Sequence, residues 1–137
     1  MSKPIVIFYL DQPEAVSLAL LTEKYGDRFE FKNLRNYFPD TNDLDRHIGC
    51  GRYEPDQKVD EVCMDAAAVV WQVAPSHGTP WFRRLKGQGY QGTTIAFASS
   101  SSMLDQCGHG AEYKLPAFAG PGSRSLTERI YDCLPQQ

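Results

Sequence analysis

Several features that would place the chain in a special class are missing from its 137 residues. No apolar run approaches the ~20 residues that a membrane-spanning helix needs, and the segment after Met1 lacks the apolar core and cleavage site of a signal peptide. Basic residues do not outnumber acidic ones, and the net charge is −3. A basic face for nucleic acid is therefore not indicated. We expect a cytoplasmic protein that binds neither a membrane nor nucleic acid.

Cysteine is scarce and scattered. The four cysteines are Cys50, Cys63, Cys107 and Cys133. Without a secretion signal, this spacing indicates reduced thiols rather than a disulfide framework. The pairs His47 with Cys50 and Cys107 with His109 do not have standard zinc spacings, so we expect no metal. A nucleophilic Cys107 with His109 or His77 as base stays open beside the simpler interpretation of a buried thiol.

The common nucleotide-binding fingerprints are absent too. No Walker sequence is present, and Gly49-Cys50-Gly51 does not form the glycine pattern of a dinucleotide-binding turn. The overall composition is ordinary, with 42% hydrophobic and 23% charged residues. A chain of this size and composition favours one globular domain with its own hydrophobic core. We therefore expect residues 1–137 to form a single domain.

What is present is an alternation of strand-like and helix-like segments. Residues 5–10 form a continuous apolar run, which is typical of a strand buried on both faces. Further strands are expected over residues 29–34, 66–73, 93–98 and, at an edge because of Pro116, 112–118. Helices are expected over residues 11–25, 59–64, 79–87 and 125–134. This alternation predicts an α/β fold with an open, mainly parallel sheet of about five strands and helices on both faces.

Three of the expected helices begin with residues that are typical of helix caps. The segment 36–56, in contrast, has no regular pattern. Asp11 with Glu14 and Ser125 with Glu128 have the spacing of a capping box. Thr79 is followed by a proline, which suits a cap and the first helical position. Residues 36–56 show no periodicity, and so long an irregular stretch inside a domain is usually functional or mobile.

Polar segments follow the strands at the edge where ligands bind in such sheets. In open α/β folds, ligands lie outside the carboxyl ends of the strands. Two of these segments lead into helix starts, where free backbone N–H groups and the helix dipole favour an anion. A plain helix cap at Thr79 and a solvated serine loop are the alternatives. The candidate ligand-binding residues are Asp11, Pro75, Ser76, His77, Gly78, Thr79, Ser99, Ser100, Ser101 and Ser102.

Residues 69–82, VVWQVAPSHGTPWF, resemble a strand and loop of a known family. The family is that of the nucleoside 2-deoxyribosyltransferases, including its deoxynucleoside-monophosphate N-glycosidases. Pro75, Ser76 and Gly78 match the loop of this family. The resemblance implies that Tyr9 corresponds to a tyrosine of the family's site and that Asp60 lies near its active-site aspartate. Tyr9 and Asp60 are thus the candidate catalytic residues.

The sequence departs from the family where the chemistry takes place. Phe82 stands at the position of the nucleophilic glutamate, and Ala67 replaces an expected aspartate. A phenyl ring cannot attack an anomeric carbon. Either Glu54 or Glu61 has taken over, or the glycosyl chemistry is lost, which is the simpler interpretation. We expect a protein that binds a nucleoside- or nucleotide-like small molecule without a cofactor; any activity would be that of an N-glycosidase or nucleoside deoxyribosyltransferase.

A flavodoxin-like protein that binds FMN is the first alternative. It shares the α/β order, the length and a loop of this kind after the third strand. Trp71, Trp81 and Tyr53 would be available to stack on the flavin ring. The first loop, which begins at Asp11, lacks the Ser/Thr-rich phosphate cradle of such proteins.

A protein-interaction module without a ligand is the second alternative. Its surface would be the irregular segment 36–56, which carries Tyr37, Phe38 and Tyr53. Exposed aromatic side chains in this segment would also allow a homodimer.

Overall fold

The structure, a computed structural model, describes residues 3–10, 16–38, 57–73, 79–108, 110–118 and 120–135. Its strands form one five-stranded sheet in the order β2-β1-β3-β4-β5, and every neighbouring pair is parallel. The strands are β1 (Ile5–Tyr9), β2 (Glu30–Asn33), β3 (Ala68–Gln72), β4 (Thr93–Ala98) and β5 (Tyr113–Pro116). The helices are α1 (Leu18–Tyr25), the 3-10 helix η2 (Leu34–Asn36), α3 (Gln57–Met64), α4 (Thr79–Gly87), α5 (Ser101–Cys107) and α6 (Leu126–Cys133).

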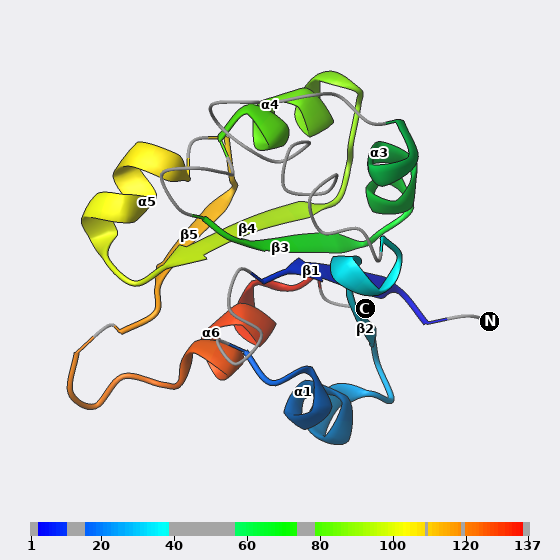
Figure 1. The fold of residues 1–137 in the computed structure, drawn as a ribbon. Helices are drawn as coiled ribbons and strands as arrows, with labels where there is room; N and C mark the ends of the chain where they lie inside the picture. Colours follow the sequence, from blue (N-terminus) through cyan, green and yellow to red (C-terminus); the bar gives the residue numbers. More distant parts are fainter. Residues whose placement is uncertain are drawn as a thin grey trace.

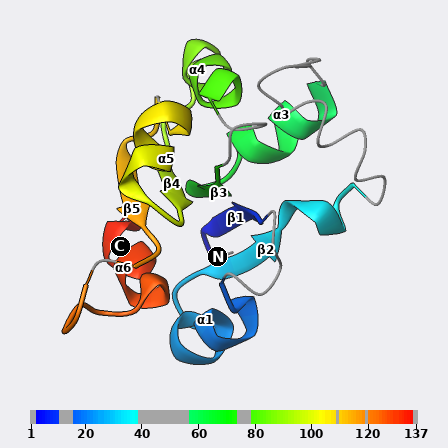
Figure 2. The same cartoon turned by 60° about the vertical axis from the view of Figure 1, so that its left-hand side comes forward.

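The helices cover both faces of the sheet. Figure 1 shows α1 and α6 on one face and α3, α4 and α5 on the other, and Figure 2 shows the same three layers from another side. Side chains of a strand alternate between the faces. Val6 and Phe8 pack with the α1 and α6 layer, whereas Ile7 and Tyr9 pack with the opposite layer. The predicted open α/β fold is confirmed.

The central strands explain why the apolar runs were informative. β1 lies between β2 and β3, with Ile7 opposite Val69. Four of its five residues are buried, because helices cover both faces. A strand in this position has no solvated face, so it reads as a continuous apolar run rather than an alternation.

Helix α1 begins later than the sequence pattern predicted. Its N-cap is Ser17, whose Oγ accepts a hydrogen bond from the Leu20 N–H at 3.1 Å. The predicted start at Asp11 is therefore wrong for this helix, and residues 11–15 lie outside the described residues. A serine is as good a cap as an aspartate. The predicted stop is confirmed, since Gly26 donates to the Thr22 carbonyl at 2.9 Å.

Helix α5 was not predicted at all. It is short, and Leu104 is the only one of its described residues that is buried, so it has almost no apolar periodicity. Ser100 caps it by accepting from the Met103 N–H at 3.2 Å. The serines after β4 are thus a helix start rather than a plain loop. At α6 the predicted cap is confirmed, with Ser125 accepting from the Glu128 N–H at 3.3 Å.

The irregular segment 36–56 is described only at its beginning. Residues 34–36 form η2, and residues 39–56 lie outside the described residues. Among the helices that the structure describes, none has the length and apolar character required to cross a membrane.

Candidate functional site

The carboxyl ends of the strands meet at one edge of the sheet, because all five strands are parallel. The strand order reverses direction between β1 and β3. The chain leaves β1 toward α1 on one face and leaves β3 toward α4 on the other (Figure 1). Such a reversal is the general ligand-binding position of open α/β sheets. The sequence analysis predicted the candidate ligand-binding residues at this same edge.

Arg35 lies over the carboxyl end of β1. Its Nε donates to the Leu10 carbonyl at 3.2 Å, and its terminal nitrogen donates to the Tyr9 hydroxyl at 3.3 Å. The guanidinium carbon is 4.9 Å from the centroid of the Tyr9 ring, which adds a cation–π contact. The Asn33 side chain caps η2 by accepting from the Arg35 N–H at 3.0 Å. These contacts hold a half-buried cation beside the reversal of the sheet.

Sequence reasoning missed Arg35. Arg35 follows β2, the strand that pairs with β1. The strand order therefore places Arg35 near the end of β1, and this order is the information that would have identified the residue. Hydrophobic periodicity does not reveal which strands are neighbours. Arg35 also lies directly before the irregular segment 36–56.

Tyr9 ends β1 at the predicted edge but is fully buried. Its ring packs on Trp71, the residue opposite it in β3, at 5.7 Å between centroids. Trp71 in turn packs edge-on against Phe82 at 6.3 Å. Trp71 is 0% exposed, so the interpretation of this residue as a stacking surface for a flavin is wrong. Tyr9 supports the position of Arg35, and its direct contact with a ligand stays a prediction.

Asp60 is buried between α3 and α4, with 2% of its surface exposed. Its Oδ2 accepts from Arg84 Nε at 2.8 Å and from Gln88 Nε2 at 3.0 Å. The carboxylate is buried while the Arg84 side chain is 32% exposed, and removal of one partner of such a pair is costly. The structure does not bring Asp60 into contact with Tyr9 through any described interaction, and its predicted role toward a ligand remains untested.

Of the two positions of the missing carboxylates, Phe82 is buried and Ala67 is partly buried. Phe82 is fully buried against Trp71, and Ala67 leads into β3, where its N–H donates to the Ile5 carbonyl at 2.8 Å. Glu61 is exposed on α3, and Glu54 lies outside the described residues. The described residues thus place no carboxylate at the position of the family's nucleophile.

Of the candidate ligand residues, the four serines are the best described. Ser99, Ser100, Ser101 and Ser102 are all exposed. The Ser100 hydroxyl is occupied by the cap of α5. Ser101 and Ser102 lie in the first turn of that helix. Asp11, Pro75, Ser76, His77 and Gly78 lie outside the described residues, and Thr79 is the first residue of α4.

Neither of the described thiols has the lowered pKa that is typical of a reactive cysteine. Burial raises the pKa of Cys63, and a coulombic effect of Asp60 adds to the increase. Burial also raises the pKa of Cys133. Cys63 is buried, and a buried neutral thiol is inert. No group of metal-ligating side chains occurs within the described ranges; His47, Cys50 and His109 lie outside them, as does the Cys107 side chain.

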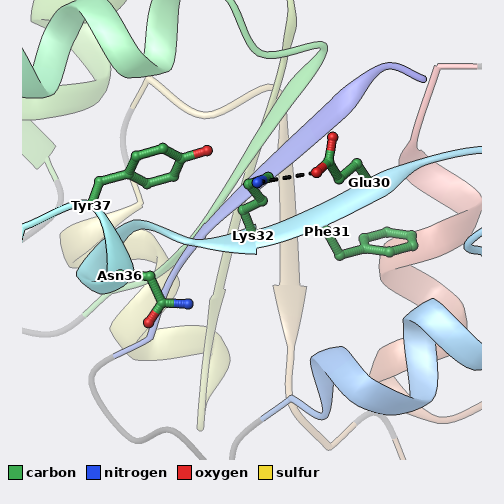
Figure 3. A pocket seen from close by; sticks show the side chains of 5 residues that line it. All are labelled: Glu30, Phe31, Lys32, Asn36 and Tyr37. Carbon is green, nitrogen blue, oxygen red and sulfur yellow. Dashed lines mark ion pairs between the residues drawn. The ribbon is translucent and has the colours of Figure 1, made fainter. Parts of the chain in front are cut away.

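A cavity of about 340 Å³ lies elsewhere, along the outer strand β2. It is lined by Glu30, Phe31, Lys32, Asn36 and Tyr37 (Figure 3). Tyr37 is 39% exposed, and Phe38 is partly buried against the core. This cavity does not include Arg35, Tyr9 or Trp71. Two of its lining residues, Asn36 and Tyr37, begin the predicted interaction segment 36–56, so the cavity lies beside that segment and not at the reversal of the sheet.

Comparisons of the chain with family models, with curated proteins and with solved structures give no match. The resemblance to the deoxyribosyltransferases therefore stays a prediction that rests on residues 69–82.

Proposed function

We propose that this protein binds a nucleoside- or nucleotide-like small molecule at the carboxyl edge of its sheet. The observation that carries the proposal is the reversal of strand order beside a fixed arginine. Arg35 is held at the end of β1 by Tyr9 and Leu10, and it offers a charged partner for a phosphate or carboxylate. Arginine is well suited to such anions because its guanidinium donates hydrogen bonds from a planar fork.

The exposed serines supply a second group of partners at the same edge. The ends of β1 and β4 are two strand spacings apart, or about 10 Å. A ligand that spans this distance contacts Arg35 with its anionic group and Ser99, Ser101 or Ser102 with its hydroxyls or base. In the sheet β3 lies between β1 and β4, and the family-like residues follow β3 in the sequence.

A thermal-shift screen tests the proposal. Deoxynucleoside and ribonucleoside monophosphates, inorganic phosphate and FMN are added separately to the full chain. A ligand that binds only the folded state raises the melting temperature by mass action. We expect a nucleoside monophosphate to raise it more than inorganic phosphate does, because the sugar and base add contacts at the serines.

Arg35→Gln and Arg28→Gln form a matched pair for this screen. Arg28 is exposed at the turn before β2, at the opposite end of the strand, where it donates to the Tyr131 hydroxyl at 2.7 Å. Loss of a charged hydrogen bond is worth about 1.5–3 kcal/mol, so Arg35→Gln should weaken binding about tenfold or more. Arg28→Gln should leave the affinity unchanged. Equal affinities of the two variants, or no shift with any ligand, would exclude the proposed site.

The same site is proposed to lack glycosyl transfer. Phe82 fills the nucleophile position with a buried ring, so no carboxylate of the described residues stands ready to attack a sugar. Incubation of the protein with deoxynucleoside monophosphates should release no free base. Base release at an enzymatic rate would contradict this part of the proposal and would direct attention to Glu54 or Glu61.

FMN binding is a second candidate, and the strand order favours it. The order β2-β1-β3-β4-β5 is also that of flavodoxin-like proteins, which bind FMN at the reversal between β1 and β3. The fit is incomplete, because Tyr9 and Trp71 are both buried there. FMN titration separates the two candidates: quenching of flavin fluorescence with a saturable curve would favour FMN over a nucleoside monophosphate.

A further inference from the structure

In the part of the chain that the structure describes, the outer edge of β2 has no strand beside it. Glu30 donates its N–H to the Pro4 carbonyl of the β1 side at 2.9 Å. Backbone groups alternate in direction along a strand, so those of Phe31 and Asn33 point away from β1. An edge of this kind is a template for pairing with another strand.

The side chains of this edge carry alternating charges on one face. Glu30 and Lys32 lie on the same side of the strand and form an ion pair at 3.0 Å, and Phe31 points to the other side (Figure 3). The Glu30 and Lys32 side chains are 45% and 38% exposed. Phe31 is only partly buried, against Phe8 and Phe29. Both faces of the edge can therefore bury more surface.

We infer that two copies of the chain associate through their β2 edges, antiparallel and centred on Phe31. A two-fold contact pairs the same patch of both copies. In this register Phe31 lies opposite the partner's Phe31, and the two residues exchange both backbone hydrogen bonds. Glu30 then lies opposite the partner's Lys32, and Lys32 opposite the partner's Glu30. The sequence Glu-Phe-Lys is thus complementary to itself.

The charges select this register over its neighbour. If the centre of the two-fold contact moves by one residue, from Phe31 to Lys32, then Lys32 lies opposite the partner's Lys32. Like charges directly opposite each other destabilise a strand pair, whereas opposite charges stabilise it. A single lysine on an edge strand usually prevents pairing. Here the glutamate two residues away converts the same lysine into half of an ion pair between copies.

The neighbouring cavity fits this association. Tyr37 lies beside Lys32, whose Nζ is 5.9 Å from the centroid of the tyrosine ring. It is one of the few large apolar side chains exposed in the described residues. A second copy on the β2 edge covers the cavity between Tyr37 and the strand. Because β2 has only four residues, we expect a weak dimer that dissociates on dilution and at high salt.

Charge reversal tests the pairing. Sedimentation velocity is measured on the wild-type chain, on Glu30→Lys and on Lys32→Glu over a range of concentrations. Each variant alone places like charges opposite each other, so its dimer dissociation constant should rise about tenfold or more. An equimolar mixture of the two variants restores opposite charges in both pairs. We expect the mixture to form heterodimers with an affinity close to that of the wild type.

Matched controls carry the same charge changes elsewhere. Glu23→Lys lies on an exposed position of α1, and Lys114→Glu lies on β5, the opposite edge strand. Both controls should dimerise like the wild type. A wild-type chain that stays monomeric at every concentration, single variants that dimerise normally, or a mixture without heterodimers would each overturn the inference. Preserved circular dichroism of the variants shows that loss of dimer is not loss of fold.

Discussion

Between α3 and α4, Asp60 and Tyr90 are buried, and their polar groups are paired within the protein. Asp60 accepts from Arg84 and Gln88, and the Tyr90 hydroxyl donates to the Ala66 carbonyl at 2.9 Å. At the carboxyl ends of the strands, the polar side chains are more exposed: the serines after β4 are exposed, and Arg35 is half-buried with partners of its own in Tyr9 and Leu10.

The difference separates buried groups, which stabilise the fold, from exposed groups that a ligand can reach. A buried carboxylate or hydroxyl must be satisfied within the protein, because its loss of hydration is not otherwise compensated. Tyr90 is packed so closely that a Cβ on Gly92 would collide with its hydroxyl group. The serines at the carboxyl edge are exposed, so a ligand can reach them. Mutations should therefore affect stability in the first region and binding in the second.

The largest effect is expected at Asp60. Asp60→Ala leaves Arg84 and Gln88 without their shared acceptor, and breaking a buried pair costs about 3 kcal/mol when one partner keeps some access to solvent. Urea unfolding should show this loss. Asp65→Ala, at an exposed position just after the same helix, should change nothing measurable. If Asp60→Ala were stable but failed to bind nucleotides, the residue would belong to the ligand site.

Tyr90→Phe tests the same region by removing one oxygen. The Ala66 carbonyl loses its buried hydrogen bond, which should cost about 1–2 kcal/mol. The reference variant is Tyr113→Phe, because Tyr113 is 41% exposed on the edge strand β5. Thermal unfolding of the two variants gives the comparison, and equal melting temperatures would show that the Tyr90 hydroxyl does not contribute.

Alkaline pH should weaken the same region through Cys63. Burial raises the pKa of this thiol above its ordinary value of 9.0. The folded state therefore keeps a proton that the unfolded state loses. The stabilisation is complete below pH 9 and declines as the pH rises toward the folded-state pKa, by about 1.4 kcal/mol per pH unit. Tyr90 adds a similar decline above pH 10, because burial raises its pKa as well.

Cys63→Ala isolates the contribution of the thiol. Its free energy of unfolding should fall less steeply than that of the wild type between pH 9 and pH 10, where Lys and Tyr titration affects both chains alike. Parallel curves for the two proteins would mean that Cys63 keeps its ordinary pKa in the folded state.

The sequence predicted the fold better than the site, for physical reasons. Buried runs such as residues 5–10 and capped helices such as α6 are local patterns, and they were confirmed. Helix α5 escaped notice because it buries almost nothing. The position of Arg35 depends on strand order, which is a long-range property. The partners of Asp60 are Arg84 in α4 and Gln88 just after it, 24 and 28 residues along the chain, and no spacing rule reveals such partners.

The smallest effects are expected at the serines after β4. One helix start there contains both a hydroxyl that stabilises the fold, that of Ser100, and an exposed hydroxyl that a ligand can reach, that of Ser102. Ser100→Ala removes the cap of α5 and should cost about 1 kcal/mol. Ser102→Ala changes an exposed hydroxyl in the first turn and should leave stability unchanged. If the carboxyl edge binds a nucleotide, Ser102→Ala weakens that binding, measured by calorimetric titration. Ser100→Ala should keep its affinity at a temperature where it remains folded, since its hydroxyl is already occupied. If Ser100→Ala weakened nucleotide binding and Ser102→Ala did not, the ligand would contact Ser100. The Ser100 hydroxyl would then cap α5 only in the ligand-free protein.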